Sequence, residues 1–150
     1  MSKKLFYLSA IAVFALDRLT KILLENQHFT LIPGILGIQG THNPGMAFGL
    51  LSGKTLLLTA VAVVLLFGML WYVHKHSRHP LELLGLGLMA GGAVGNLVDR
   101  ALYGYVIDML EPLFMNLFIF NVADAGITIG AVLLGAAILF GKEDTNDANA

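Results

Sequence analysis

The sequence predicts an all-α membrane protein with four transmembrane helices and a small extracytoplasmic β platform between the first two. Of its 150 residues, 57% are apolar and only 13% are charged, about half the fraction in a typical soluble domain, roughly 25%. Mean hydropathy is correspondingly high, at +0.77. A bilayer core takes about 17–25 apolar residues per helix. Four segments satisfy this requirement, at 5–24, 55–73, 81–98 and 122–140.

The composition also narrows the function classes. The chain has no cysteine, which excludes disulfides, thiolate metal sites and a cysteine nucleophile. A net charge of -1 without a basic stripe gives no reason to expect a nucleic-acid partner. Three histidines at 74, 76 and 79 lack the carboxylate of a HExxH pattern, so they indicate a polar loop and no metal site. The first apolar run continues into Asp17-Arg18 without a small-x-small cleavage site, so we interpret it as a retained span.

Basic residues in the short loops predict the orientation of the spans. Most of them lie on the side of the two termini, at Lys3, Lys4, Lys75 and Arg78. Positive loops mark the cytoplasmic side. We therefore expect a multi-pass membrane protein with both termini in the cytoplasm. The whole chain, 1–150, is expected to form one domain.

The first outer loop is too broken for a helix. Residues 28–52 hold five glycines and two prolines among apolar residues, which predicts short strands joined by turns. Such a platform could lie on lipid and hold a substrate. The tail at 142–150 is polar, and we expect it to be disordered.

Several polar residues fall in or beside the apolar segments. Asp17 and Lys21 are four residues apart, which predicts a structural ion pair. Arg18 is expected to reach the outer headgroups, and Asp99 with Arg100 to form an ion pair or a helix cap. The predicted topology brings the polar residues of the spans to one depth near the outer interface, namely Asp17, Lys21, Asn96, Asp99 and Asp124.

Glycines at every fourth position predict close helix packing. Gly87, Gly91 and Gly95 form one such stripe, and Gly126 and Gly130 form a shorter one. Small residues at this spacing let membrane helices approach closely. We expect the stripes to bring the third and fourth spans together.

Asp108 and Asp124 are the strongest candidates for a catalytic pair. Asp108 lies in the apolar stretch VIDML, and Asp124 lies just inside the fourth span. Asp124 could instead cap that helix. However, acids in apolar surroundings are costly and indicate function. Two carboxyls at one site share a proton, so one can take a proton from water while the other protonates a scissile carbonyl.

Five blocks carry a resemblance to a known family. They are D-R-L-T-K (17–21), N-P-G-M-A-F-G (43–49), G-G-A-V-G-N-L-V-D-R (91–100), G-Y-V-I-D (104–108) and F-N-V-A-D (120–124). In this order and on four spans, they resemble the lipoprotein signal peptidases (signal peptidase II), the membrane aspartyl protease family of bacteria. The chain departs from the family at Arg18, where glutamine is common, and at Met109, where phenylalanine is common. Residues 112–119 match no block.

The resemblance implies a specific activity. The substrate would be a prolipoprotein whose cysteine carries diacylglycerol, and cleavage would fall just before that cysteine. The resemblance implies location in the bacterial cytoplasmic (inner) membrane and catalysis by Asp108 and Asp124 near its outer face, with no metal or cofactor. It also implies a structural role for Asp17 and Lys21. The chain is expected to contact membrane lipid and to be a monomer. The implied substrate-binding or supporting positions are Asn43, Gly45, Asn96, Asp99, Arg100 and Asn121.

Two other function classes compete with this interpretation. In a small proton-coupled transporter or channel subunit, Asp17, Asp99 and Asp124 would relay protons. Such proteins usually show repeats and polar residues near the midplane, which this sequence lacks. A membrane assembly factor without enzymatic activity would need neither Asp108 nor Asp124.

Overall fold

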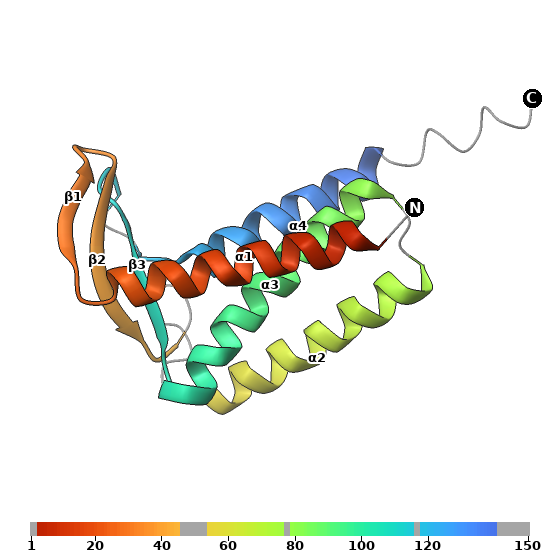
Figure 1. Ribbon diagram of the computed structural model, residues 1–150, viewed down its shortest axis with the longest axis horizontal. Coiled ribbons are helices and arrows are strands. Elements are labelled where there is room, and N and C mark those ends of the chain that lie inside the picture. Colours follow the sequence, from red (N-terminus) through yellow and green to blue (C-terminus); the bar gives the residue numbers. More distant parts are fainter. Residues whose placement is uncertain (1–2, 46–53, 77–78, 116–117, 141–150) are drawn as a thin grey trace, which may run out of the picture.

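The computed structural model describes residues 3–45, 54–76, 79–115 and 118–140. Within these ranges the helices are α1 (Lys4–Leu24), α2 (Thr55–Lys75), α3 (Pro80–Tyr103) and α4 (Val122–Phe140). The strands are β1 (His28–Ile32), β2 (Leu36–Asn43) and β3 (Val106–Pro112). Figure 1 shows the sheet across one end of the helices, while α1 begins and α4 ends at the opposite end. The predicted tail at 142–150 and the part of the outer loop at 46–52 lie outside the described residues.

Three of the described helices, α2, α3 and α4, are long and apolar enough to cross a membrane. α1 is as long as α2, with 21 residues, but it carries Asp17, Arg18 and Lys21 and is too charged to qualify by composition. The structure is therefore mostly helical, with three candidate membrane spans among the described residues. A fourth span formed by α1 remains a prediction.

The ends of α3 have local causes. Pro80 lies in the first turn, where the backbone N–H that proline lacks would have no partner within the helix. The ring of His79 accepts a hydrogen bond from the Leu81 amide. Gly104 ends the helix in a left-handed conformation, at φ 80°, which glycine adopts without steric cost. The helix thus runs five residues beyond the predicted end at 98. This extra length places Asp99 and Arg100 on the helix.

The sheet corrects the prediction of a platform built only between the first two spans. Its order is β1-β2-β3, with both pairs antiparallel, and β3 comes from the segment between α3 and α4. The pairing places Asp108 opposite Thr41 and Val106 opposite Asn43. Most of β3 is buried on both faces. The alternation of apolar and polar residues that marks a half-exposed strand is therefore missing.

The first glycine stripe packs against a different helix from the one we predicted. A side chain at Gly87 or Gly91 would overlap α1, at the Phe6 and Ala10 carbonyls. The contact between α3 and α4 runs through Gly130 of the second stripe, as predicted, and through α3 glycines outside the first stripe. Gly85 and Gly130 lie against each other's backbone there, and Gly92 meets the Ala123 carbonyl. α3 is therefore the central helix, with small residues on two faces.

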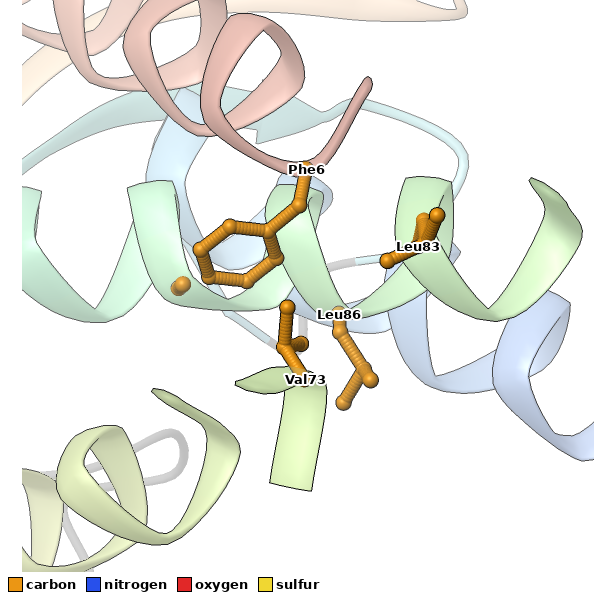
Figure 2. Packing of buried hydrophobic residues seen from close by; sticks show 5 residues of the cluster. Phe6, Val73, Leu83 and Leu86 are labelled. Atoms are coloured by element: carbon orange, nitrogen blue, oxygen red, sulfur yellow. The ribbon is translucent and has the colours of Figure 1, made fainter. Parts of the chain in front are cut away.

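An apolar cluster closes the end of the helices away from the sheet. Its buried members come from α1, α2 and α3, and Figure 2 shows Phe6 and Val73 packed beside α3. The cluster comprises Phe6, Val73, Leu83, Leu86 and Ala90. It holds the three helices together at this end and leaves the polar residues to gather beside the sheet.

Candidate active site

Asp108 is buried on β3 between two asparagine side chains. Its carboxyl oxygens accept hydrogen bonds from Nδ2 of Asn43 at 2.9 Å and Nδ2 of Asn121 at 2.7 Å. Only 2% of its surface is exposed. Burial raises the pKa of Asp108 to about 7, and the negative charge of Asp124 adds to the rise, while the hydrogen bonds from Asn43 and Asn121 oppose it. The carboxyl therefore exchanges its proton close to neutral pH.

Asp124 lies in the first turn of α4 and faces α3. Its Oδ1 accepts a hydrogen bond from Nδ2 of Asn96 at 2.8 Å. The side chain that caps α4 is Asn121, whose Oδ1 accepts from the Asp124 amide at 2.8 Å. Capping is therefore assigned to Asn121, and the carboxyl of Asp124 is left for another role.

Asn96 and Asn121 link the two acids, Asp108 and Asp124. Nδ2 of Asn121 donates to Oδ1 of Asn96 at 3.1 Å, so hydrogen bonds run from Asp108 through Asn121 and Asn96 to Asp124. Residues from β3, α3 and α4 thus form one network. The predicted pair comes together from segments that are 16 positions apart in the sequence (124 - 108).

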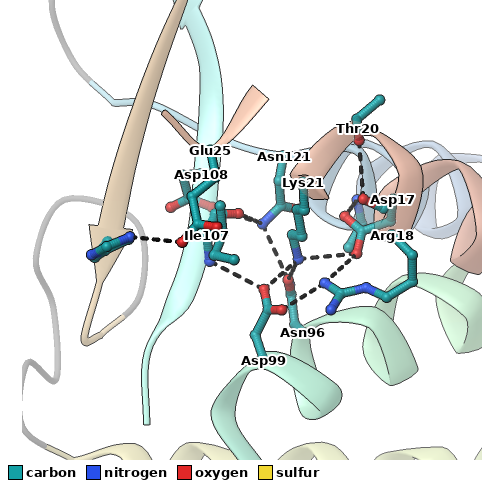
Figure 3. Close-up of polar contacts among 12 residues, drawn as sticks. Asp17, Arg18, Thr20, Lys21, Glu25, Asn96, Asp99, Ile107, Asp108 and Asn121 are labelled. Atoms are coloured by element: carbon teal, nitrogen blue, oxygen red, sulfur yellow. Dashed lines mark hydrogen bonds and ion pairs between the residues drawn. The ribbon is translucent and has the colours of Figure 1, made fainter. Parts of the chain in front are cut away.

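Beside this network lies a cluster of four charged side chains, shown in Figure 3. Nζ of Lys21 is 3.0 Å from Asp17 and 2.7 Å from Asp99, which confirms the predicted pairing of Asp17 with Lys21. Lys21 also donates to Oδ1 of Asn96 at 3.1 Å. The cluster therefore reaches the acid network directly.

Two predictions about this cluster are wrong. Arg18 does not extend to the headgroups: its Nη2 lies 2.6 Å from Asp99 and 3.2 Å from Asp17. Asp99 pairs with Arg18 and Lys21 instead of Arg100, because its position on α3 faces α1. Sequence reasoning thus missed Arg18 as part of the site. The signal was present in the three charges within D-R-L-T-K, which α1 can bury only against matching charges.

Arg100 and Gly45 lie at the edge of the site. Nη2 of Arg100 donates to the Gly45 carbonyl at 3.3 Å, and the Gly45 amide donates to Oδ1 of Asn43 at 2.9 Å. Asn43 thus holds Gly45 and Asp108 at the same time. The structure brings all the predicted site residues into one region at the sheet end of the helices.

A cavity of about 770 Å³ opens onto the acids. Its polar lining within the described residues is Asn43, Asn96, Arg100, Asp108, Asp124 and Thr128. The remainder is largely apolar and includes Leu58, Leu65 and Met69 on α2 and Ile127 on α4. In the described ranges, His, Asp and Glu side chains form no group of three that could hold a metal ion. The arrangement suits an apolar ligand with one polar, reactive end.

Comparison with known proteins identifies the family. The model of the family described as signal peptidase (SPase) II matches residues 9–140. The chain belongs to the signal peptidase II family. It is therefore a membrane enzyme, a peptidase, as the resemblance implied.

Individual relatives agree with this membership. The lipoprotein signal peptidase of Syntrophomonas wolfei is 37% identical over 149 residues, which cover 95% of this chain and 99% of that protein. The lipoprotein signal peptidase of Streptococcus pneumoniae is 39% identical over 116 residues, 77% of this chain and 74% of that protein. A solved structure of a bacterial membrane enzyme superposes with a TM-score of 0.87 at 29% identity, covering 95% of this chain and 92% of that one. These comparisons give no support to the transporter alternative.

Proposed function

We propose that this signal peptidase II removes the signal peptide from diacylglyceryl-modified prolipoproteins by cleaving just before the lipidated cysteine. The observation that carries the proposal is the position of two carboxyl side chains, Asp108 and Asp124, at the polar end of an apolar cavity. The apolar walls between α2, α3 and α4 suit fatty chains. The carboxyls lie where the peptide attached to those chains would enter.

The two aspartates share one proton and act on a single water. The ionised carboxyl removes a proton from this water, whose oxygen attacks the scissile carbonyl carbon while the protonated carboxyl donates to the carbonyl oxygen. Collapse of the tetrahedral intermediate breaks the C–N bond, and the leaving nitrogen takes a proton from the pair. Asn43, Asn96 and Asn121 orient the carboxyls through the hydrogen bonds described above.

Arg100 and Gly45 bind the substrate backbone beside the scissile bond. Their mutual hydrogen bond holds the arginine at the cavity, where it retains further N–H donors for peptide carbonyls. Asp17, Lys21 and Asp99 support this arrangement from α1 and α3. The site thus has residues for proton transfer, residues that bind the substrate and residues that hold both in position.

α1 is the fourth membrane span in this account. Asp17, Arg18 and Lys21 face α3. The opposite surface is apolar and more than half exposed at Leu8, Ile11, Leu19 and Ile22, as expected for a surface against lipid. Four spans put both termini on one side of the membrane, and the basic loops make that side the cytoplasm. The aspartates then lie near the outer face of the cytoplasmic membrane. Residues 1–150 then act as a single domain and as a monomer.

The substrate assignment is tested with two versions of one precursor peptide, with and without the diacylglyceryl group, and the protein purified in detergent. We expect cleavage of the lipidated peptide at the bond before cysteine, and much slower cleavage of the unlipidated one because the apolar cavity then stays empty. Equal rates for both peptides would contradict the assignment. Cleavage at another bond would do so as well.

The pH dependence of cleavage should reflect the raised pKa of Asp108. Since burial raises this pKa to about 7, the carboxyl holds its proton below that pH and loses it above. We therefore expect kcat/KM to fall as the pH rises through about 7, because the pair then has no proton to donate. The Asn43→Ala variant removes a hydrogen bond that lowers this pKa, so its alkaline limb should move to higher pH. A limb that stays in place would contradict this role of Asn43.

A further inference from the structure

Each proposed catalytic aspartate follows directly after a backbone amide that is held by a buried carboxylate. The Ile107 amide, just before Asp108, donates to Oδ2 of Asp99 at 3.1 Å. The Ala123 amide, just before Asp124, donates to Oδ1 of Asp17 at 3.0 Å. Hydrogen bonds to an ionised acceptor are stronger than those between neutral groups. Asp99 and Asp17 therefore act as two clamps, one on β3 and one on the start of α4.

The two clamps have no exposed surface, with Asp17 and Asp99 both at 0%, so their charges need buried cations. Lys21 lies between them, and its ammonium also donates to Asn96. These contacts use all three donors of the lysine. Asp17 and Asp99 carry two negative charges, so Lys21 alone would leave one of these charges without a cation.

Arg18 supplies the second positive charge and bridges the same two carboxylates. Its Nη2 is 2.6 Å from Oδ1 of Asp99 and 3.2 Å from Oδ2 of Asp17. Arg18 is absent from the described lining of the cavity, so its influence on the reaction has to pass through the clamps.

We propose that Arg18 is a positioning residue, which balances the charge of the clamps Asp17 and Asp99 and thereby sets the distance between the carboxyls of Asp108 and Asp124. This inference rests on the proposed function, since it assigns catalysis to that pair. Without Arg18, one carboxylate charge in the cluster has no cation. The resulting repulsion between Asp17 and Asp99 shifts β3 relative to α4. Small displacements of reacting groups are costly, with a shift of about 1 Å reducing rates roughly 10²-fold.

The opposing explanation is that Arg18 only ties α1 to α3. The two explanations differ in what restores activity. If charge balance matters, a loss caused by removing Arg18 is reversed by removing one negative charge from the clamps. Asp99→Asn does this and keeps an oxygen that accepts from the Ile107 amide. If Arg18 only connects α1 to α3, a second substitution in the cluster lowers kcat further.

The experiment compares kcat and KM for the lipidated peptide among wild type, Arg18→Gln, Asp99→Asn and the double variant, each normalised to folded protein. We expect Arg18→Gln to lower kcat by about 10- to 100-fold with KM unchanged, and the double variant to recover most of this loss. Lys75→Gln removes an exposed cation at the end of α2 and should leave both constants unchanged.

Unchanged kcat in folded Arg18→Gln would overturn the inference. So would a double variant in which the two losses multiply. If Arg18→Gln does not fold, the double variant decides alone: it should fold and exceed Asp99→Asn in kcat, and a lower or equal kcat overturns the inference. Failure of the folded wild type to cleave would instead reject the proposed function. Wild-type activity together with an inactive Asp108→Asn variant keeps the two questions separate.

Discussion

Replacing Asp108 or Asp124 with asparagine is expected to abolish cleavage of the lipidated precursor. Asparagine keeps the size of the side chain but cannot exchange a proton at neutral pH. Positioned acid–base catalysis contributes about 10²–10⁴-fold to a rate, so each variant should lose at least that much in kcat. The measurement is single-turnover cleavage in detergent, with folding verified by thermal unfolding.

Glu111→Gln is the matched control for these variants. Glu111 lies on β3 like Asp108 and is partly buried, but it is not among the described residues lining the cavity. Its variant should cleave at the wild-type rate. Near wild-type turnover by folded Asp124→Asn or Asp108→Asn would show that the carboxyl in question is not part of the chemistry.

Lys21→Met is expected to cause the largest loss of stability in the chain. The side chain is only 1% exposed, and its ammonium contacts Asp17, Asp99 and Asn96. Methionine fills a similar volume without charge, so the two acids keep Arg18 as their only cation in the cluster. Breaking a buried ion pair by removing one partner costs about 3–5 kcal/mol. Thermal unfolding in detergent should therefore show a large fall in Tm.

The control for this prediction is Lys75→Met, which removes an exposed lysine at the end of α2 and should leave Tm nearly unchanged. Equal Tm values for Lys21→Met and the wild type would mean that the cluster does not stabilise the fold.

Features that depend on local sequence were predictable. The apolar segments gave the positions of the helices, and the predicted range of the last one, 122–140, agrees with α4 at both ends. Asp17 and Lys21 pair as their spacing on one helix face indicates. The predicted topology also placed the polar residues of the spans at one depth, and the structure brings them into contact: Asp17, Lys21, Asn96, Asp99 and Asp124.

Features that depend on the choice of partner were not predictable from the sequence. A glycine stripe shows that a helix packs closely, but Gly91 carries no information on whether α1 or α4 covers it. β3 is buried on both faces, so its residues gave no alternating pattern and its pairing with β2 went unseen. The charges around Arg18 in the sequence indicate that it needs buried partners, but only the fold reveals that Asp99, 81 positions away, is one of them.

The most direct test of joint action by the two carboxyls is single-turnover cleavage by the double variant Asp108→Asn/Asp124→Asn. Residues that act as one unit show strongly non-additive losses. The account predicts that the double variant is about as slow as the slower single variant, because either loss already disables the pair. A rate reduced by the product of the two single losses would show that the carboxyls act independently and would contradict it.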